Sequence, residues 1–406
     1  MTPRTLVTMT SGEFGQRVRD LIRDRDMSVR AVARHLNYDH AYLSRVLSGK
    51  QQPSRQLVTA LDNLLKTNGE LAEIAARVAP PTVSPEAAES PAITDRMLKL
   101  NEARGADFAA AIRETSHRLV VLDNELGGVS IAEPAGRAFK VVHRRLGVGD
   151  YDPRYERDIQ SAAAELAEVA GWALFDAERN GAAQRFNHEA LFLANLSGDR
   201  SIALLTLQNM AMLSEWRGRN QEALAISRSV LNRRRLSPRV EAMFRFREAK
   251  GLVGTGRTPD AVESLQRARS LIEDGNDVGE PDWAWWVTHR EIDGHWGHTL
   301  QIAGDAEKAI ELLLQSVQPG RGVATGYASL SSARLAQCLL DVNAWRDAED
   351  VVRSLVTAVP GISSGRTRRV IGHVAKRHET LTGAPSSLTD TLEHLAEKLD
   401  EDPFTL

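Results

Sequence analysis

The residues best suited to chemistry lie in a short basic segment, HAYLSRVLSGKQQPS, which occupies positions 40 to 54. Arg45 can donate two parallel hydrogen bonds to the edge of a guanine in the DNA major groove. His40 and Ser44 can act as adaptable donors beside it, and Ala41 can contact a thymine methyl group. For His40, the alternative is that its ring packs at the turn between two helices. The segment therefore predicts a surface that recognises base pairs.

These side chains need a rigid frame, and residues 12 to 66 show the apolar spacing of four short helices. Ser28 can cap the second helix and Asp39 the third. Gly49 supplies the left-handed residue that ends the third helix. Two helices joined by a four-residue turn, with a cationic outer face on the second, form a helix-turn-helix. The expected core positions are Phe14, Val18, Leu21, Ile22, Met27, Val32, Ala33, Leu36, Leu43, Val46, Leu47, Leu57, Val58, Leu61, Leu64 and Leu65.

Three stretches of this segment, MSVRAVARHL, YLSRVLSGKQQPS and LVTALDNLL, resemble the lambda-repressor-like (Xre-type) helix-turn-helix family. The resemblance implies a DNA-binding domain. One position departs from the family, because Val29 stands where a glutamine often holds a phosphate. Contacts to the DNA backbone must therefore depend on other residues and on amides at the helix starts. The expected DNA-contacting residues are Ser28, Arg30, His40, Ala41, Ser44, Arg45, Lys50 and Arg55.

Charge is distributed unevenly along the 406 residues, whose formal net charge is −3. Residues 1 to 66 hold eleven Lys or Arg and six Asp or Glu, whereas the remainder holds 40 and 48. A basic end on an acidic body is typical of a protein that contacts phosphates through one domain. A single cysteine, Cys338, and the lack of an export signal or a long apolar stretch predict a cytoplasmic protein.

A helical-hairpin repeat follows the basic end. The segments GRNQEALAI, GRTPDAVES, GDAEKAIEL and NAWRDAEDV place a turn residue five positions before an alanine. We expect GAAQRFNHEAL, with Gly181 and Phe186 in these roles, to be an earlier copy. A period slightly above 34 residues is close to the tetratricopeptide repeat, whose stacked hairpins form a concave inner surface. The predicted pairs are Gly218 and Ala223, Gly256 and Ala261, Gly304 and Ala309, and Asn343 and Ala348.

These patterns predict an all-α protein with four parts. We expect the helix-turn-helix domain at residues 1–77, a Pro/Ala/Ser-rich linker at 78–96, the helical repeat domain at 97–382, and a capping helix with a tail at 383–406. The stretches 118–128, 162–199 and 281–313 resemble a group of actinobacterial regulators that join an Xre-type domain to tetratricopeptide-like repeats. A more distant likeness is to peptide-pheromone-responsive regulators of Gram-positive bacteria. These resemblances imply a transcriptional regulator but do not identify its effector.

A cluster of aromatic residues in the repeats could line a ligand site: Trp283, Trp285 and Trp286, with His289 beside them. Packing between repeats is the favoured interpretation. Asn187, Asn209 and Arg245 fall at predicted inner-helix positions and are the candidate polar contacts. The expected effector is a peptide or protein segment, with a small apolar molecule as the alternative.

No cofactor is expected. Glu291, His295 and His298 lie on one face of a predicted helix and could bind zinc, but no fourth ligand can be named. The sequence lacks a phosphate-binding Gly-rich loop, a nucleophile elbow and a metalloprotease box, so we expect no enzyme. The expected function is a homodimeric regulator that binds a double-stranded DNA operator. Its dimer interface would lie at 335–355 or at 97–146, and the alternative is an interaction scaffold without ligand sensing.

Overall fold

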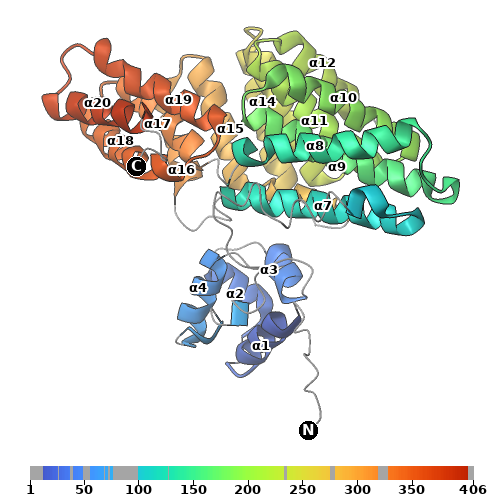
Figure 1. Ribbon diagram of the computed structural model, residues 1–406. Coiled ribbons are helices and arrows are strands. Elements are labelled where there is room, and N and C mark those ends of the chain that lie inside the picture. Colours follow the sequence, from blue (N-terminus) through green and yellow to red (C-terminus); the bar gives the residue numbers. More distant parts are fainter. Residues whose placement is uncertain are drawn as a thin grey trace. The chain divides into compact units, whose positions relative to one another are not determined.

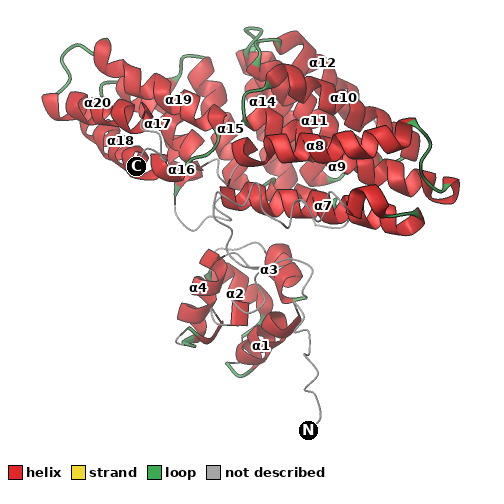
Figure 2. Cartoon of the chain, in the orientation of Figure 1, coloured by secondary structure: helices red, strands yellow, loops and turns green. Residues whose placement is uncertain are grey.

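The computed structural model describes residues 12–25, 27–36, 40–48, 55–67, 69–71, 74–75, 99–126, 128–232, 236–274, 279–318 and 328–400. Every element in these ranges is a helix, which confirms the predicted all-α fold (Figure 2). The chain divides into two compact units, the first of which holds Met1–Ser84 and the second nearly all of the remainder (Figure 1). The units are called the head and the array below. The predicted linker, 78–96, lies outside the described residues.

In the described part of the head, the four helices that the apolar spacing predicted share one apolar core. Most of the predicted core positions are buried, and Met27, Leu36 and Leu64 are partly buried. Asp39, Gly49 and the predicted start of the fourth helix at Pro53 lie outside the described residues. The helices are α1 (Gly12–Arg23), α2 (Val29–His35), α3 (His40–Leu47) and α4 (Arg55–Leu65).

The head extends beyond the fourth helix, although its apolar pattern had indicated an end near Lys66. Leu71 is fully buried in the core, and its backbone N–H donates to the Asp62 carboxylate at 3.0 Å. Arg17 on α1 forms a two-pronged ion pair with Glu70, with Nε–Oε1 and Nη2–Oε2 distances of 2.5 and 3.0 Å. These contacts attach the chain after α4 to the rest of the head.

From α7 onward, the described part of the array forms seven helix pairs, and successive helices pack against one another (Figure 1). Each pair buries an apolar stripe against its neighbours, and short 3₁₀ turns join several of them. The last helix covers the end of the core with Leu388, Leu392 and Leu395. The pairs are α7 (Gly105–Leu126) and α8 (Gly128–Gly147), α9 (Glu156–Asp176) and α10 (Asn180–Ser197), α11 (Arg200–Trp216) and α12 (Asn220–Leu231), α13 (Pro238–Val253) and α14 (Thr258–Asp274), α15 (His289–Ile302) and α16 (Ala306–Val317), α17 (Ala328–Asp341) and α18 (Trp345–Ala358), and α19 (Gly365–Ala375) and α20 (Ser386–Asp400).

The repeat turns match the sequence prediction at four places. Gly218, Gly256 and Gly304 adopt positive φ angles of 73°, 78° and 83°, and Asn343 adopts 60° in the same role. Glycine lacks the Cβ that disfavours this conformation, and asparagine tolerates it better than most residues. The alanines five positions later are fully buried where the two helices of a pair cross.

The predicted earliest copy is shifted by three residues. The positive φ belongs to Glu178, at 58°, and the fully buried alanine is Ala183. Gly181 lies inside α10 and Phe186 is only partly buried. Glutamate is not a residue type that indicates a left-handed turn. The prediction therefore placed the turn at the nearby Gly181, three residues too late.

Candidate functional site

The outer face of α3 is polar, as predicted for a recognition helix. His40 and Ser44 are exposed, whereas Leu43, Val46 and Leu47 are buried against the other helices. On α2, Arg30 is exposed as well. The side chains of Ala41, Arg45 and Arg55, and all of Lys50, lie outside the described parts of the chain.

Helix α1 packs closely against the end of α3. A Cβ atom on Gly15 would lie 2.0 Å from the carbonyl oxygen of Leu47, so only glycine permits this approach. Arg19 donates to the same carbonyl, which lies in the last turn of α3, where carbonyl groups lack partners within the helix. Ser28 accepts a hydrogen bond from the Ala31 N–H at 3.1 Å and caps α2, as predicted. The two helices of the motif are thus fixed by contacts that leave the polar face of α3 free.

The interior of the array contains a chain of polar side chains. The first helix of each pair contributes to it, and these helices are called the inner helices. Glu168 on α9 accepts a hydrogen bond from Asn209 on α11 at 2.6 Å. Gln208, next in the chain, donates to Asn209 and accepts from Arg247 on α13 at 3.1 Å. Burial raises the pKa of Glu168 to about 7, and the hydrogen bond from Asn209 offsets this only in part.

The polar chain continues along the later inner helices. Lys250 on α13 contacts His298 Nδ1 on α15, and burial lowers the pKa of both groups well below their usual values. On α15, His295 pairs with Glu291 at 3.3 Å and stacks on Phe246 with 4.2 Å between ring centroids. Burial lowers the pKa of His295 to about 3, so the ring is neutral. The interior therefore holds titratable groups whose pKa values are shifted from their ordinary values, mainly by burial.

The array closes on itself through a buried ion pair between its second and last helix pairs. Arg366 on α19 donates to Asp176 on α9 through Nε and Nη2, at 3.0 and 2.8 Å. Both side chains are almost fully buried, at 4% and 7% exposure. The guanidinium lies over the rings of Trp172, Phe175 and Trp216. Segments 190 residues apart in sequence are joined here.

A pocket of about 280 Å³ lies beside this closure and is lined by α11, α15, α17 and α19. Its walls include Arg334 and Gln337 of α17, and Gln337 accepts a hydrogen bond from Gln301 on α15 at 2.9 Å. Burial, together with the charges of Arg366 and Arg247, lowers the pKa of Arg334 to about 10 although Glu215 raises it. The guanidinium still carries a full charge at neutral pH.

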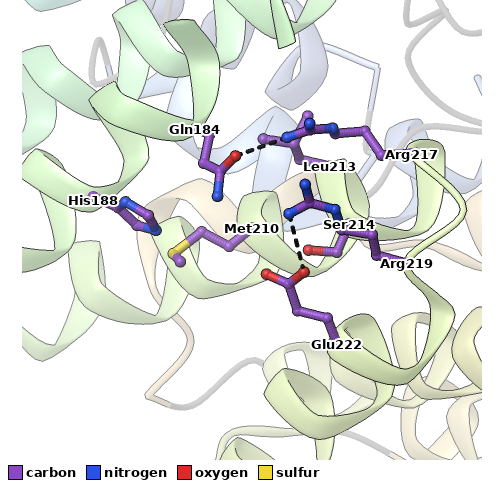
Figure 3. A pocket seen from close by; sticks show the side chains of 8 residues that line it. All are labelled: Gln184, His188, Met210, Leu213, Ser214, Arg217, Arg219 and Glu222. Atoms are coloured by element: carbon purple, nitrogen blue, oxygen red, sulfur yellow. Dashed lines mark hydrogen bonds and ion pairs between the residues drawn. The ribbon is translucent and has the colours of Figure 1, made fainter. Parts of the chain in front are cut away.

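A second hollow, between α10 and α11, is too small for a ligand (Figure 3). Its volume of about 10 Å³ is close to that needed by one water molecule. Arg217 donates to Gln184 across it at 2.7 Å, and Arg219 pairs with Glu222 at 3.5 Å. The first contact joins the repeat turn to α10, and the second joins it to α12.

The structure separates the predicted polar contacts of the array. Asn209 lies in the interior chain described above. Asn187 instead lies between α9 and α10, so close to Gly171 that a Cβ there would meet its Oδ1 at 2.5 Å. Arg245 pairs with Glu241 and Glu248, of which Glu248 also contacts Arg228 on the outer helix α12. Two residues on, Arg247 occupies the interior in its place, because residues two apart on a helix point in different directions.

The predicted aromatic cluster belongs to the packing between repeats, the interpretation favoured by the sequence. Trp283 and Trp286 pack on the core formed by α11 to α15, and the Trp283 indole donates to Ser201 at 2.9 Å. The carbonyl of Trp285 accepts from Arg239, and His289 is exposed at the start of α15. The tryptophans near the pocket are Trp172 and Trp216, which lie at the ends of α9 and α11 and have no clustering in the sequence to reveal them.

The described residues contain no group of three His, Cys, Asp or Glu side chains arranged to hold a metal ion. Glu291 and His295 pair with each other, and His298 contacts Lys250 instead of joining them. None of the described helices combines the length and the apolar character needed to cross a membrane.

Comparison with known proteins identifies the head. A helix-turn-helix domain family matches residues 13–74, which includes the segment after α4 that packs on the core. No curated protein matches the chain. Among solved structures, the chain is similar to the crystal structure of Bacillus thuringiensis PlcR in complex with the peptide PapR7 and DNA. The sequence identity is 11%, the TM-score is 0.33, and the match covers 74% of this chain and 94% of that one. No residue correspondence follows at this level of similarity.

Proposed function

We propose that the protein is a sequence-specific DNA-binding transcriptional regulator of the cytoplasm, whose array senses a ligand. The observation that carries this proposal is the helix-turn-helix domain at residues 13–74, with a polar recognition face on α3. The Xre-type and actinobacterial affinities indicated by the sequence are part of the same proposal.

In the proposed complex, the head recognises one half-site of an operator. His40, Ser44 and Arg45 face the base edges, with Arg45 making a two-pronged contact to a guanine. Arg30, Lys50 and Arg55 neutralise phosphates on the flanking backbone. One such domain covers only a half-site, so specific binding requires a dimer with two heads about one helical turn or a multiple apart.

The array supplies the dimer interface and the sensor in this proposal. Of the two predicted interfaces, the stretch 335–355 buries Leu335, Leu339 and Leu355 inside the array's own core. The stretch 97–146 instead leaves Val120 on α7 and Val129 on α8 exposed, at 43% and 48%. This exposure favours the α7–α8 pair as the place where two copies meet. The polar interior favours a sensing role, because burying charged and polar groups costs folding free energy that a scaffold with an apolar interior would not need to spend.

A mobility-shift experiment over a salt series tests the DNA-binding proposal, using the protein's own promoter region and scrambled DNA. We expect Arg45→Ala to cost about 1–3 kcal/mol on the operator and to relax specificity at one base pair. Lys50→Ala and Arg55→Ala should weaken binding to all sequences and reduce the salt slope by about one unit each. Arg353→Ala, on the exposed surface of α18, is the matched control. Equal affinity of the wild type for operator and scrambled DNA contradicts the proposal.

A further inference from the structure

The pocket between α11, α15, α17 and α19 is lined by hydrogen-bond donors. Its walls carry two arginines, Arg334 and Arg369, but no carboxylate. The amide oxygen of Gln337 already accepts from Gln301, so its NH₂ group is the part left to donate. His298 meets the Lys250 Nζ through Nδ1, and with Nδ1 as the acceptor the Nε2–H of the neutral ring is a further donor. Such a surface complements a ligand rich in acceptor oxygens.

Arg334 is the central donor, because it has no partner of its own in the described part of the chain. No carboxylate there forms an ion pair with it, and no carbonyl accepts a hydrogen bond from it. Arg366 nearby is satisfied by Asp176, and Arg369 at the rim pairs with Glu178 at 2.9 Å. A guanidinium in the interior of a protein is costly to leave unpaired.

The charges around Arg334 are mixed, because Glu215 and Glu291 favour the charged guanidinium while Arg366 and Arg247 oppose it. Arg247 and Arg366 both lower its pKa, and burial is the largest cause of that lowering. The carboxylates within electrostatic range are Glu215 and Glu291, and Glu291 is already paired with His295. The indole N–H of Trp216 is buried without a hydrogen-bond partner among the described residues, so acceptors are scarce at this place.

We propose that this pocket binds the carboxylate group of the effector, with Arg334 and Gln337 as its principal contacts. The proposal deepens, and rests on, the sensing role proposed for the array. A carboxylate offers two coplanar oxygens, which match the planar forks of a guanidinium and an amide. A volume of about 280 Å³ accommodates the end of a peptide or a small organic acid.

A carboxylate fits better than a phosphate for a geometric reason. Phosphates in proteins are commonly held by backbone N–H groups at the start of a helix. Here His298, Arg334 and His373 project from helix interiors or last turns, so side chains supply the donors. Arginine forks bind carboxylates and phosphates alike, so the preference for a carboxylate rests on the lack of a helix start among the lining residues.

The test measures melting of the full-length protein at matched ionic strength with four probes. They are a mixed-sequence heptapeptide library with free C-terminal carboxylates, the same library with carboxamide ends, succinate, and inorganic phosphate. Wild type is compared with Arg334→Gln and with Arg346→Gln, which removes an exposed arginine of α18. We expect a carboxylate probe to raise the melting temperature of the wild type and of Arg346→Gln. Arg334→Gln should need at least about tenfold more of the same probe for an equal shift.

A second variant keeps the proposal testable if Arg334→Gln fails to fold. Gln337→Glu places a carboxylate inside the pocket beside Arg334. It should raise the melting temperature of the ligand-free protein and abolish the response to the carboxylate probe. A fall in melting temperature together with an unchanged probe response contradicts the proposal.

The four probes distinguish the source of the carboxylate. A response to the free-ended library but not to the carboxamide library identifies a peptide C-terminus, and a response to succinate alone identifies a small organic acid. A response to phosphate alone overturns the proposal, as does an absence of any response. Equal responses to both libraries, unaffected by Arg334→Gln, overturn carboxylate recognition while supporting a sensing array. Operator binding measured on the same samples reports separately on the DNA-binding role.

Discussion

The head and the array place their polar chemistry on opposite sides of their folds. In the head, the core is apolar, and His40 and Ser44 of α3 are exposed. In the array, the outer helices pack through alanine and leucine, and the inner helices carry Glu168, Arg247 and Lys250 into the interior. The difference shows that a domain which reads a large rigid partner needs only a stable frame. Under the proposed sensing role, the array encloses its ligand and bears the cost of buried charged groups.

The largest expected effect comes from removing the ion pair that joins α19 to α9 in the array. Arg366→Ala removes one partner of the buried pair with Asp176 and leaves an uncompensated carboxylate. We expect a loss of about 3–5 kcal/mol in the free energy of unfolding. All seven tryptophans lie in the array, so tryptophan fluorescence in urea follows this unit alone. Arg353→Ala, whose pair with Glu349 is exposed, should cost no more than about 1 kcal/mol. Similar losses for the two variants show that the closure does not stabilise the array.

The same contrast explains which features could be predicted from the sequence. The head's core residues follow a clear helical period because polar and apolar sides do not mix there. The turns at Gly218 and Asn343 were also predictable, since few residues tolerate a left-handed backbone. In the array interior the period fails, because buried Arg247 and Glu168 look like surface residues. For this reason the helical pattern indicated Arg245 as an inner-helix contact, although Arg247 lies in the interior, and it gave no signal for Arg334. The closure by Arg366 depends on the curvature of the whole array, which no local pattern encodes.

A glycine substitution in the head should destabilise the head and leave the stability of the array unchanged. Gly15→Ala forces a Cβ against the backbone of α3, so we expect it to destabilise the head by an amount near the upper end of about 1–3 kcal/mol. Hydrogen exchange of the head amides should accelerate and operator binding should weaken, with no change in the tryptophan-detected transition. The control is Gly372→Ala in α19, where a Cβ has no neighbour within 4 Å. That change should stabilise the array by about 0.5–1 kcal/mol. Unaltered exchange in Gly15→Ala would mean that α1 and α3 do not approach so closely.

The cost of the polar interior can be measured through Glu168. Its pKa rises from 4.5 to about 7 in the fold, so the folded state retains a proton that the unfolded chain has lost between these pH values. The array should therefore lose stability as the pH rises from about 4.5 to about 7. Glu168→Gln removes this term while its amide oxygen can still accept from Asn209. The variant should equal wild type at pH 4 and exceed it at pH 8 by at most about 3 kcal/mol.

Urea unfolding followed by tryptophan fluorescence at pH 4, 6 and 8 measures this difference. Glu307→Gln, at an exposed position on α16, serves as the control and should show the same small difference from wild type at each pH. A Glu168→Gln variant that is less stable than wild type at pH 8 shows that the ionised carboxylate has a stabilising partner. In that case the interior would not carry the cost that distinguishes it from the head.

The smallest expected effect is at Ser28, where two substitutions distinguish capping of α2 from contact with a DNA phosphate. Ser28→Ala removes the acceptor for the Ala31 N–H and should cost the head about 1 kcal/mol. Ser28→Asp retains a capping oxygen and adds a negative charge that favours the start of α2, so head stability should be kept. The added charge should nevertheless weaken binding to operator and scrambled DNA alike, because it repels a phosphate placed at this helix start. Amide exchange in the head measures the first effect and the salt-dependent mobility shift the second. If Ser28→Asp binds DNA as wild type does, Ser28 acts only as a cap and the phosphate contacts lie elsewhere on the head.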